Sequence, residues 1–276
     1  MQNPKASLII SFYNNFNFLE LVLAGLERQT LKRFEIIIAD DGSTEEVKNK
    51  IKNYKQGTDL NIKHVWHEDL GWRKNKILNK AIIESESDYI IFIDGDCIPH
   101  ERFIEDHFKN GEKNKILAGR RVNVSEKLTK KLTYDFVKKG RLIFFDLLFD
   151  SIIGDSRDVE KGLRIGYKPL RNIFNKSKRG VLGCNFSLHK SCLLGVNGFD
   201  ERYINPAVGE DTDIERRLLR NGLTIKTIKF AGIQYHLYHK KLERKNYAAS
   251  MKILEANDEA KVTYTPYGIE KTKKLL

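Results

Sequence analysis

The chain has 276 residues, of which 41% are hydrophobic and 31% are charged. This composition is typical of a folded globular protein and excludes fibrous, low-complexity and disordered chains. The formal net charge of +12 is suited to nucleic acid, an anionic membrane surface or a phosphate-bearing substrate. No helix-turn-helix, zinc-finger or RNA-binding pattern accompanies the charge, so we do not expect nucleic acid as a partner.

The N-terminus and the cysteines indicate a compartment. The chain enters an apolar run without the basic and long apolar regions of a signal peptide. No apolar stretch approaches the ~20 residues that span a bilayer. The three cysteines, Cys97, Cys184 and Cys192, have unrelated spacings and form no C-x-x-C pair. We therefore expect a protein of the reducing cytoplasm.

The first part of the chain alternates apolar runs with amphipathic stretches. Strands are expected at residues 6–12, 34–39, 62–66 and 89–93, and helices at residues 19–29, 45–54 and 74–85. This rhythm predicts an α/β fold with a mainly parallel sheet that helices cover on both faces. Ligands of such sheets bind beyond the carboxyl ends of the strands. The acidic clusters Asp40-Asp41 and Asp94-Gly95-Asp96 should both lie at that edge.

The pattern weakens in the middle of the chain and returns later. Residues 116–124 predict a strand, and residues 132–153 mix basic side chains with a dense apolar run. Strands are expected again at residues 181–188 and 224–230, and helices at residues 190–196 and 211–221. Gly222 is suited to end the last of these helices. Residues 233–239 lead into a charged tail.

Asp94 and Asp96 are the first candidates for chemistry. Two carboxylates one residue apart, directly after a buried strand, are costly unless a cation offsets their charge. Mg²⁺ or Mn²⁺, held jointly by carboxylate and diphosphate oxygens, is the natural partner. A polar turn with Gly95 at its tip is the alternative, because a D-x-D pattern is common.

Two other loops at this edge have both a functional and a structural explanation. In the first, a carboxylate of Asp40 or Asp41 could accept hydrogen bonds from a base or a ribose, or could cap the next helix together with Ser43. In the second, residues 71–76 place cations and backbone N–H groups before a helix, where they could hold a diphosphate. A solvated helix start would explain the same pattern.

The acids that open the helix at residues 211–221 have two explanations as well. The helix dipole favours Glu210, Asp211 and Asp213 in a first turn without any function. A carboxylate at a helix N-terminus in a cleft can also act as a general base. His236 and His239 follow the last predicted strand, and either could complete a metal site that begins at Asp96.

These pieces, in this order, resemble family 2 inverting glycosyltransferases of the GT-A fold. The resemblance is strongest to the branch similar to β-1,4-galactosyltransferases and bacterial chondroitin polymerase modules. The matching stretches are SLIISFYNN, IIIADDGST, LGWRKNKILNKAI, YIIFIDGDC, GCNFSLHK, VNGFDERY, GEDTDIERRLLRNG and YHLYH. They cover about residues 6 to 240 and leave the basic middle and the tail unmatched.

The resemblance implies a metal-dependent transfer of galactose or N-acetylgalactosamine, or another hexose or N-acetylhexosamine, from a UDP-sugar to a glycan or lipid-linked glycan. It implies Asp211 as the catalytic base, Glu210 as the acceptor-binding residue, and Asp96 and His236 as ligands of Mn²⁺ or Mg²⁺. It places Ser11, Tyr13, Asp40, Arg73, Lys76 and Asp94 at the nucleotide, and Gly183 and Asn185 at the donor sugar. It divides the chain into a GT-A domain at residues 1–240, with a nucleotide-binding half (1–112), a basic insertion (113–180) and an acceptor half (181–240), and a tail at residues 241–276.

One departure from the branch leaves the acceptor open. The branch has a Trp-Gly pair before the Glu-Asp pair, whereas this chain has Ala207, Val208 and Gly209 there. A non-catalytic nucleotide- or glycan-binding protein of the same fold is the alternative function. The retention of Asp96, Asp211 and His236 together argues against it.

The apolar run after Lys138, Lys139 and Arg141 has two explanations. Residues 142–153 could form a core helix of an insertion. Alternatively, an apolar stretch between cationic flanks could lie in the interface of an anionic membrane. The cations that follow the run are Lys161, Arg164, Lys168, Arg171, Lys176, Lys178 and Arg179. On the second explanation, the protein associates peripherally with the inner face of the membrane.

Overall fold

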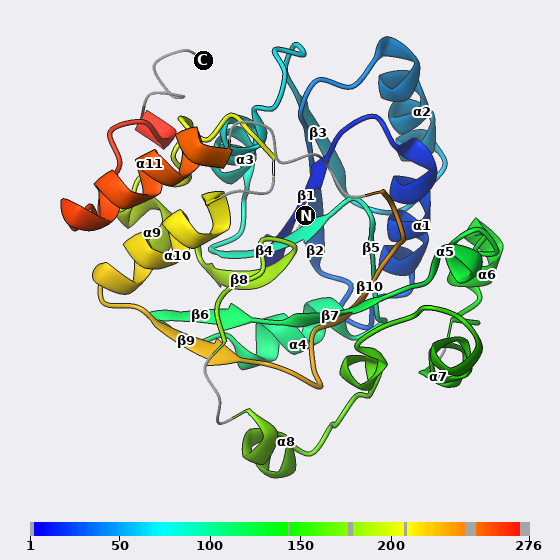
Figure 1. The fold of residues 1–276 in the computed structure, drawn as a ribbon. Helices are drawn as coiled ribbons and strands as arrows, with labels where there is room; N and C mark the ends of the chain where they lie inside the picture. Colours follow the sequence, from blue (N-terminus) through cyan, green and yellow to red (C-terminus); the bar gives the residue numbers. More distant parts are fainter. Residues whose placement is uncertain (1–2, 143, 176–178, 207–208, 241–246, 271–276) are drawn as a thin grey trace.

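The computed structural model describes residues 3–142, 144–175, 179–206, 209–240 and 247–270 (Figure 1). A central sheet of seven strands has the order β3-β2-β1-β4-β8-β6-β9. Strand β8 is antiparallel to both of its neighbours, and the other adjacent pairs are parallel. The prediction of a mainly parallel sheet is therefore confirmed. The strands are β1 (Ala6–Phe12), β2 (Phe34–Asp40), β3 (Ile62–Trp66), β4 (Tyr89–Asp94), β6 (Lys115–Ala118), β8 (Asn185–His189) and β9 (Thr224–Thr227).

Helices cover both faces of the sheet, which explains why its central strands are apolar at nearly every position. On one face, Leu8 and Ile10 of β1 belong to a core shared with α1 and α2, and on the other face Ile9 packs in a core shared with α3 and α10. All seven residues of β2 are buried. The helices around the sheet are α1 (Phe16–Glu27), α2 (Glu45–Gln56), α3 (Lys74–Glu84), α4 (Phe103–Asn110), α9 (Lys190–Gly195) and α10 (Glu210–Arg220).

A second, three-stranded sheet has the order β5-β10-β7 and comprises β5 (Cys97–Pro99), β10 (Ile233–His236) and β7 (Arg120–Asn123). The prediction of a single strand at residues 116–124 is therefore wrong. Two strands, β6 and β7, occupy this region, because the chain passes from the large sheet to the small one at Gly119. A Cβ at Gly119 would lie 2.0 Å from Oδ1 of Asn185, so only glycine fits at this crossing. The register of the small sheet pairs His236 with Cys97, next to Asp96.

The basic middle of the chain forms short helices, and its part up to residue 147 shares a hydrophobic core with the small sheet. They are α5 (Glu126–Thr129), α6 (Tyr134–Lys138), α7 (Phe144–Ile153), the 3-10 helix η1 (Val159–Gly162) and α8 (Lys168–Phe174). Strand β7 and α7 both contact η1. Figure 1 shows α7 and α8 on the lower side of the molecule, away from α3 and α11.

The residues expected to form a charged tail fold back onto α10. Helix α11 (Tyr247–Glu259) presents Asn257, whose Nδ2 donates to Asp213 Oδ1 at 2.7 Å. Beyond the helix, Ile269 is buried in the core that contains Ile214 of α10. This segment is therefore part of the folded unit, whereas residues 241–246 and 271–276 lie outside the described residues. The proposed division into halves stays a prediction.

Candidate active site

The acidic clusters share the carboxyl edge of the large sheet. Strand β1 lies between β2 and β4, and its register pairs Phe12 with Asp40 and Ser11 with Asp94. Ser11 also accepts a backbone hydrogen bond from Gly95 at 2.8 Å. The turn that holds Asp96 is thereby tied to the end of β1, at the edge where the fold predicts a ligand.

Asp96, His236 and His239 form a candidate metal centre. One ligand atom from each lies within 4.8 Å of the others. Nε2 of His239 is 3.2 Å and Nε2 of His236 is 3.6 Å from Oδ2 of Asp96. Two nitrogen donors and one oxygen donor suit Mn²⁺ better than Mg²⁺, which prefers oxygen ligands throughout. The residues present therefore fit a divalent transition ion.

The pKa shifts of Asp96 and His236 favour the protonation states that a metal requires, whereas the shift of His239 opposes them. Burial lowers the pKa of His236 to about 4, so its imidazole is neutral at pH 7. Burial opposes the effect, but the hydrogen bond with His239 helps to lower the pKa of Asp96. The hydrogen bond with Asp96 raises the pKa of His239. Both imidazoles face the same carboxylate, so the geometry allows either histidine, or both, as a ligand.

Lys74 joins this centre to the start of α10. Its Nζ lies 3.3 Å from Oδ1 of Asp94. Burial opposes its charge, but the nearby carboxylates of Asp94, Asp211 and Glu210 outweigh burial and raise the pKa of Lys74. Burial raises the pKa of Asp94, against the opposing charge of Lys74. Carboxylates from β4 and α10, far apart in sequence, therefore act electrostatically on one cation.

Asp211 is held in place by the backbone before β8. The N–H of Gly183 donates to Oδ2 of Asp211 at 2.8 Å, and a Cβ at position 183 would lie 2.2 Å from Oδ1. Glycine is therefore needed for this close approach. The neighbouring Glu210 is buried, and burial together with the charge of Asp211 raises its pKa. Gly183 therefore contacts the predicted base, and its expected place at the donor sugar stays a prediction.

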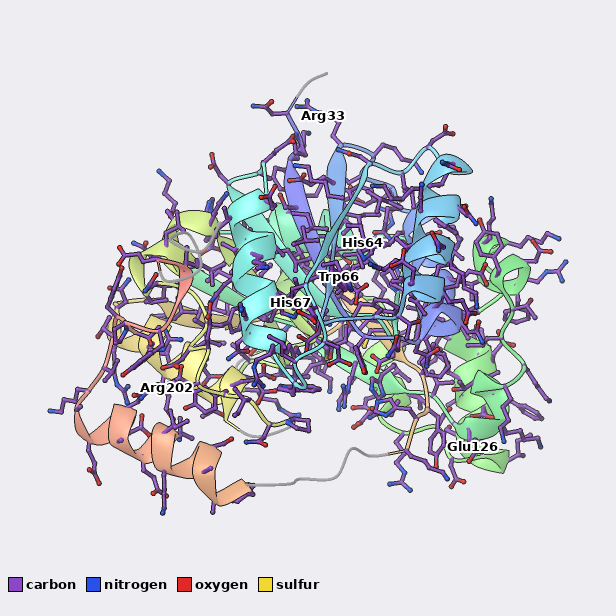
Figure 2. The ribbon with its side chains drawn as sticks, turned by 90° about the horizontal axis from the view of Figure 1, so that it is seen from above. Arg33, His64, Trp66, His67, Glu126 and Arg202 are labelled. Carbon is purple, nitrogen blue, oxygen red and sulfur yellow. The ribbon has the colours of Figure 1, made fainter. Side chains whose placement is uncertain are left out.

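The turn after β2 is braced from β3 and does not present free carboxylates. Asp40 is fully buried, accepts a hydrogen bond from the N–H of Ser43 at 2.9 Å, and contacts Nε2 of His64 at 2.8 Å. Asp41 contacts Nε2 of His67 at 2.7 Å. Figure 2 shows His64 and His67 together with Trp66 at the end of β3. Asp40 thus stabilises the turn from inside the protein. Its burial does not fit the expected contact with a nucleotide.

Three other residues were expected at the nucleotide, and their side chains lie in three different environments. Tyr13 is exposed, and its hydroxyl donates to Oδ2 of Asp69 at 2.8 Å, so it can form a rim of the site. The guanidinium of Arg73 bends back to the carbonyl of Trp72 at 2.8 Å. Residues two apart on a helix point in nearly opposite directions, so Lys76 leaves the side of α3 on which Lys74 faces Asp94. Its ammonium instead lowers the pKa of Lys80, although burial is the larger cause of that shift.

Asn185 is a structural residue. Its side chain is fully buried, donates to the carbonyls of Arg120 and Gly232 at 2.7 and 2.9 Å, and contacts Nε2 of His107 at 3.0 Å. Every polar atom of this amide is therefore engaged inside the protein. The expected contact of Asn185 with a donor sugar does not fit this network, which instead joins the two sheets.

Two cations of the site did not stand out in the sequence. Lys74 is one, and its position as the first residue of α3 is the signal that could have separated it from Arg73 and Lys76. Arg121 on β7 is the other, and its one side-chain hydrogen bond among the described residues is a weak 3.5 Å contact with Sγ of Cys184. Its charge acts on His236 and on Asp94, so it lies beside the metal centre.

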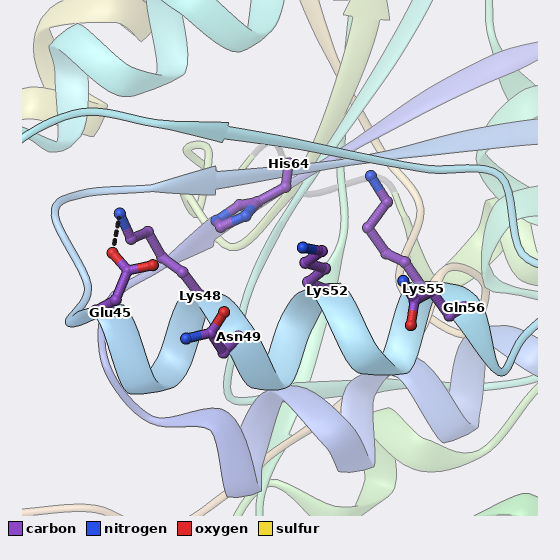
Figure 3. Close-up of a pocket in the computed structure, with 7 residues that line it drawn as sticks. All are labelled: Glu45, Lys48, Asn49, Lys52, Lys55, Gln56 and His64. Carbon is purple, nitrogen blue, oxygen red and sulfur yellow. Dashed lines mark ion pairs between the residues drawn. The ribbon is translucent and has the colours of Figure 1, made fainter.

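A hollow of about 570 Å³ lies elsewhere, between α2 and β3. Figure 3 shows His64 facing Lys48, Lys52 and Lys55 across it. None of the metal-centre residues lines this hollow. Among its lining residues, His64 contacts Asp40 in the turn after β2.

Comparison with known proteins identifies the family. Residues 7–190 match the family described as glycosyl transferase family 2, and residues 172–240 match the family described as the N-terminal domain of galactosyltransferase. The chain is 26% identical over 83% of its length to a chondroitin synthase of Escherichia coli, and 26% identical over 85% to one of Pasteurella multocida. It spans only 34% and 25% of the lengths of these two relatives.

Solved structures share the fold at low sequence identity. The Staphylococcus aureus protein TarS, solved as residues 1–349 with UDP-GlcNAc, superposes with a TM-score of 0.59 at 16% identity, over 91% of this chain and 66% of that one. A mannosyltransferase from Pyrobaculum calidifontis, solved with GDP-Man and Mn²⁺, gives a TM-score of 0.55 at 15% identity, over 93% and 62%. These proteins are glycosyltransferases of the GT-A type, so the GT-A fold class is confirmed. With two thirds of its residues inside the family match, this chain belongs to glycosyl transferase family 2.

Proposed function

We propose that this glycosyltransferase transfers a hexose or N-acetylhexosamine from a UDP-sugar to a glycan or lipid-linked glycan, with inversion at the anomeric carbon. The observation that carries the proposal is the cluster around Lys74. The charge of Lys74 interacts with Asp94, which lies next to the metal centre, and with Glu210 and Asp211 of α10. A donor at the metal and an acceptor at α10 would therefore meet.

Asp211 is suited to act as the general base. Its carboxylate, oriented by the Gly183 amide, takes the proton of an acceptor hydroxyl. The hydroxyl oxygen attacks the anomeric carbon from the face opposite the nucleotide, and the bond from that carbon to the phosphate oxygen breaks. The electron pair of that bond leaves with the diphosphate. Attack opposite the leaving group inverts the anomeric configuration.

The remaining residues place and neutralise the reactants. Asp96, His236 and His239 would hold a divalent ion, which supplies positive charge against the departing diphosphate. Arg121 lies beside these ligands with only a weak partner in the described chain, so its guanidinium is available to the same phosphates. Glu210, whose pKa burial raises, can hydrogen-bond to a hydroxyl of the acceptor sugar.

The relatives favour particular sugars. Chondroitin synthases are the relatives that this chain matches over more than four fifths of its length, and the match at residues 172–240 is to a galactosyltransferase domain. Galactose and N-acetylgalactosamine are therefore our first choices for the donor sugar. A TarS structure binds UDP-GlcNAc, which supports a uridine nucleotide on this fold.

A donor screen tests the proposal. The purified protein is incubated with Mn²⁺ and each common UDP-sugar or GDP-sugar, and release of the nucleoside diphosphate is measured without and with candidate acceptor glycans. We expect release from one class of UDP-sugar, and a ~10²-fold lower rate in Asp211→Asn with little change in donor affinity. Release from GDP-sugars alone would overturn the donor assignment, and an Asp211→Asn variant as fast as the wild type would overturn the base.

A further inference from the structure

Helix α7 carries its apolar stripe on the outside of the protein. Phe145, Leu148, Phe149, Ile152 and Ile153 recur at the spacing of one helix face. All five are exposed, with Phe145, Phe149 and Ile152 at 70%, 63% and 76%. The inward face instead holds Leu147 and Asp150, whose carboxylate accepts a hydrogen bond from Ser156.

Helix α8 continues the same feature further along the insertion. Its exposed apolar side chains include Leu170, Ile173 and Phe174, with Tyr167 just before the helix. Half of the twenty large hydrophobic side chains that are exposed in the described chain lie between residues 145 and 174. Exposed apolar side chains this concentrated in one segment mark that segment as an interaction site.

We propose that the outer faces of α7 and α8 dock this enzyme onto a lipid bilayer that contains anionic phospholipid. The five stripe residues of α7 offer no side-chain hydrogen-bond donor or acceptor. Protein interfaces contain about one hydrogen bond per 100–200 Å², whereas the acyl region of a bilayer requires none. The chemistry of the stripe therefore matches lipid better than a protein partner.

The charges beside the stripe complete the match to anionic headgroups. Lys139 and Arg141 precede α7, Lys168 opens α8, and Arg179 follows it; all four are exposed and form no salt bridge within the described chain. Other basic residues of the insertion are already engaged: Lys161 pairs with Asp158, Arg164 pairs with Asp106, and Arg171 is buried against Asn110. Attraction to headgroups therefore comes from fewer cations than the sequence suggests, and apolar insertion contributes the larger share.

No helix in the described residues is long and apolar enough to cross a membrane. The docking that we propose is instead interfacial, with α7 lying in the plane of the headgroups. It does not depend on which sugar the enzyme transfers, and its test needs no activity. A lipid-linked acceptor is one substrate that such docking would bring within reach.

Co-sedimentation with vesicles tests the surface. The wild-type chain is mixed with vesicles of phosphatidylcholine alone or with added phosphatidylglycerol, at low and high salt. We expect binding to the anionic vesicles, at least ~10-fold weaker for the double variant Phe149→Ser/Ile152→Ser. Leu194→Ser/Tyr247→Ser removes two exposed apolar side chains elsewhere and should bind like the wild type. Circular dichroism of each variant checks that the fold is kept.

Two further arms separate the alternatives. Lys139→Ser/Arg141→Ser should weaken binding to anionic vesicles and reduce its dependence on salt. Sedimentation velocity reports self-association of the free protein. A wild-type chain that does not bind vesicles, a stripe variant that binds equally well, or a dimer that the stripe variant dissociates would each overturn the proposal. The last result would assign the stripe to a second copy of the chain.

Discussion

The backbone N–H of Gly183 donates a 2.8 Å hydrogen bond to the carboxylate of Asp211 and leaves no space for a side chain between them. This contact joins the segment before β8 to the first turn of α10. It holds a carboxylate at the helix N-terminus, where the helix dipole also favours a negative charge. The position of the proposed base thus depends on a residue that carries no functional group.

Gly183→Ala should displace the base without removing it. A Cβ would lie 2.2 Å from Oδ1 of Asp211, so the carboxylate must move, and a displacement of about 1 Å costs ~10²-fold in rate. We expect kcat to fall while the affinity for UDP stays near that of the wild type. Gly57→Ala, where the closest neighbour would lie at 3.8 Å, is the matched control. An unchanged kcat in Gly183→Ala would contradict the role of this contact.

Removal of the metal should stop transfer. We expect EDTA to abolish turnover and Mn²⁺ to restore it, and Asp96→Ala to lose metal-dependent UDP binding as well. The loss should exceed ~100-fold, because outer-shell partners of metal ligands alone contribute 10–100-fold. Isothermal titration of UDP with and without Mn²⁺ measures it. Full activity in EDTA would show that the Asp96 centre does not serve the reaction.

Metal affinity should depend on pH through His239 more than through His236. The hydrogen bond with Asp96 raises the pKa of His239, so protons compete with the metal there as pH falls through neutrality. Burial lowers the pKa of His236 to about 4, so it stays neutral over that range. We expect Mn²⁺ affinity, measured by titration, to fall below pH 7 and His239→Ala to flatten this dependence. An equally steep profile in His239→Ala would place the competing proton elsewhere.

Arg121→Ala should weaken donor binding. Within the described residues, the substitution removes only the weak hydrogen bond to Cys184, so the free energy of unfolding should change little. A lost hydrogen bond to a charged group is worth about 1.5–3 kcal/mol, which corresponds to roughly a 10- to 100-fold weaker affinity for UDP. Arg33→Ala, at the opposite end of the sheet (Figure 2), is the matched control. Equal UDP affinities for both variants would remove Arg121 from the site.

The buried His107 should make the fold sensitive to mild acid. It contacts Ser187 and Asn185, and burial lowers its pKa to about 4. The unfolded chain, with a histidine pKa of about 6.5, binds the proton first, so stability is full above pH 6.5 and falls as pH drops toward 4. The loss approaches about 3 kcal/mol over that window. Urea unfolding at several pH values should show a flatter profile for His107→Gln, even though that variant is less stable at pH 7.

The sequence predicted the large sheet because its strands are continuous apolar runs that end at polar turns. The family resemblance also implied that Asp94, Asp96, His236 and Asp211 belong to one site. The start of α3 at Lys74 was predicted, but the contact of Lys74 with Asp94 was not, because it depends on how the helix packs against the end of β4. The burial of Asp40 was not predictable either, because its partner His64 comes from the neighbouring strand β3.

The insertion shows the limit of composition. The apolar density of residues 142–153 is equally compatible with a buried helix and an exposed one. The structure leaves the stripe outside because the inner face of α7 is already filled by Leu147 and by the hydrogen bond between Asp150 and Ser156. Such a choice depends on tertiary contacts, which a helical period alone does not contain.

The packing of the C-terminal segment on α10 has a consequence for building chimaeras of this family. Asn257 bonds to Asp213, Thr265 bonds to Asp200, and Ile269 is buried beside Ile214, so the helix that carries Glu210 and Asp211 is assembled with residues from beyond the family match. A recombinant enzyme that exchanges residues 181–240 for those of a relative would separate α10 from its own support. The exchangeable unit is therefore discontinuous, and a graft of the acceptor side must carry residues 247–269 with it.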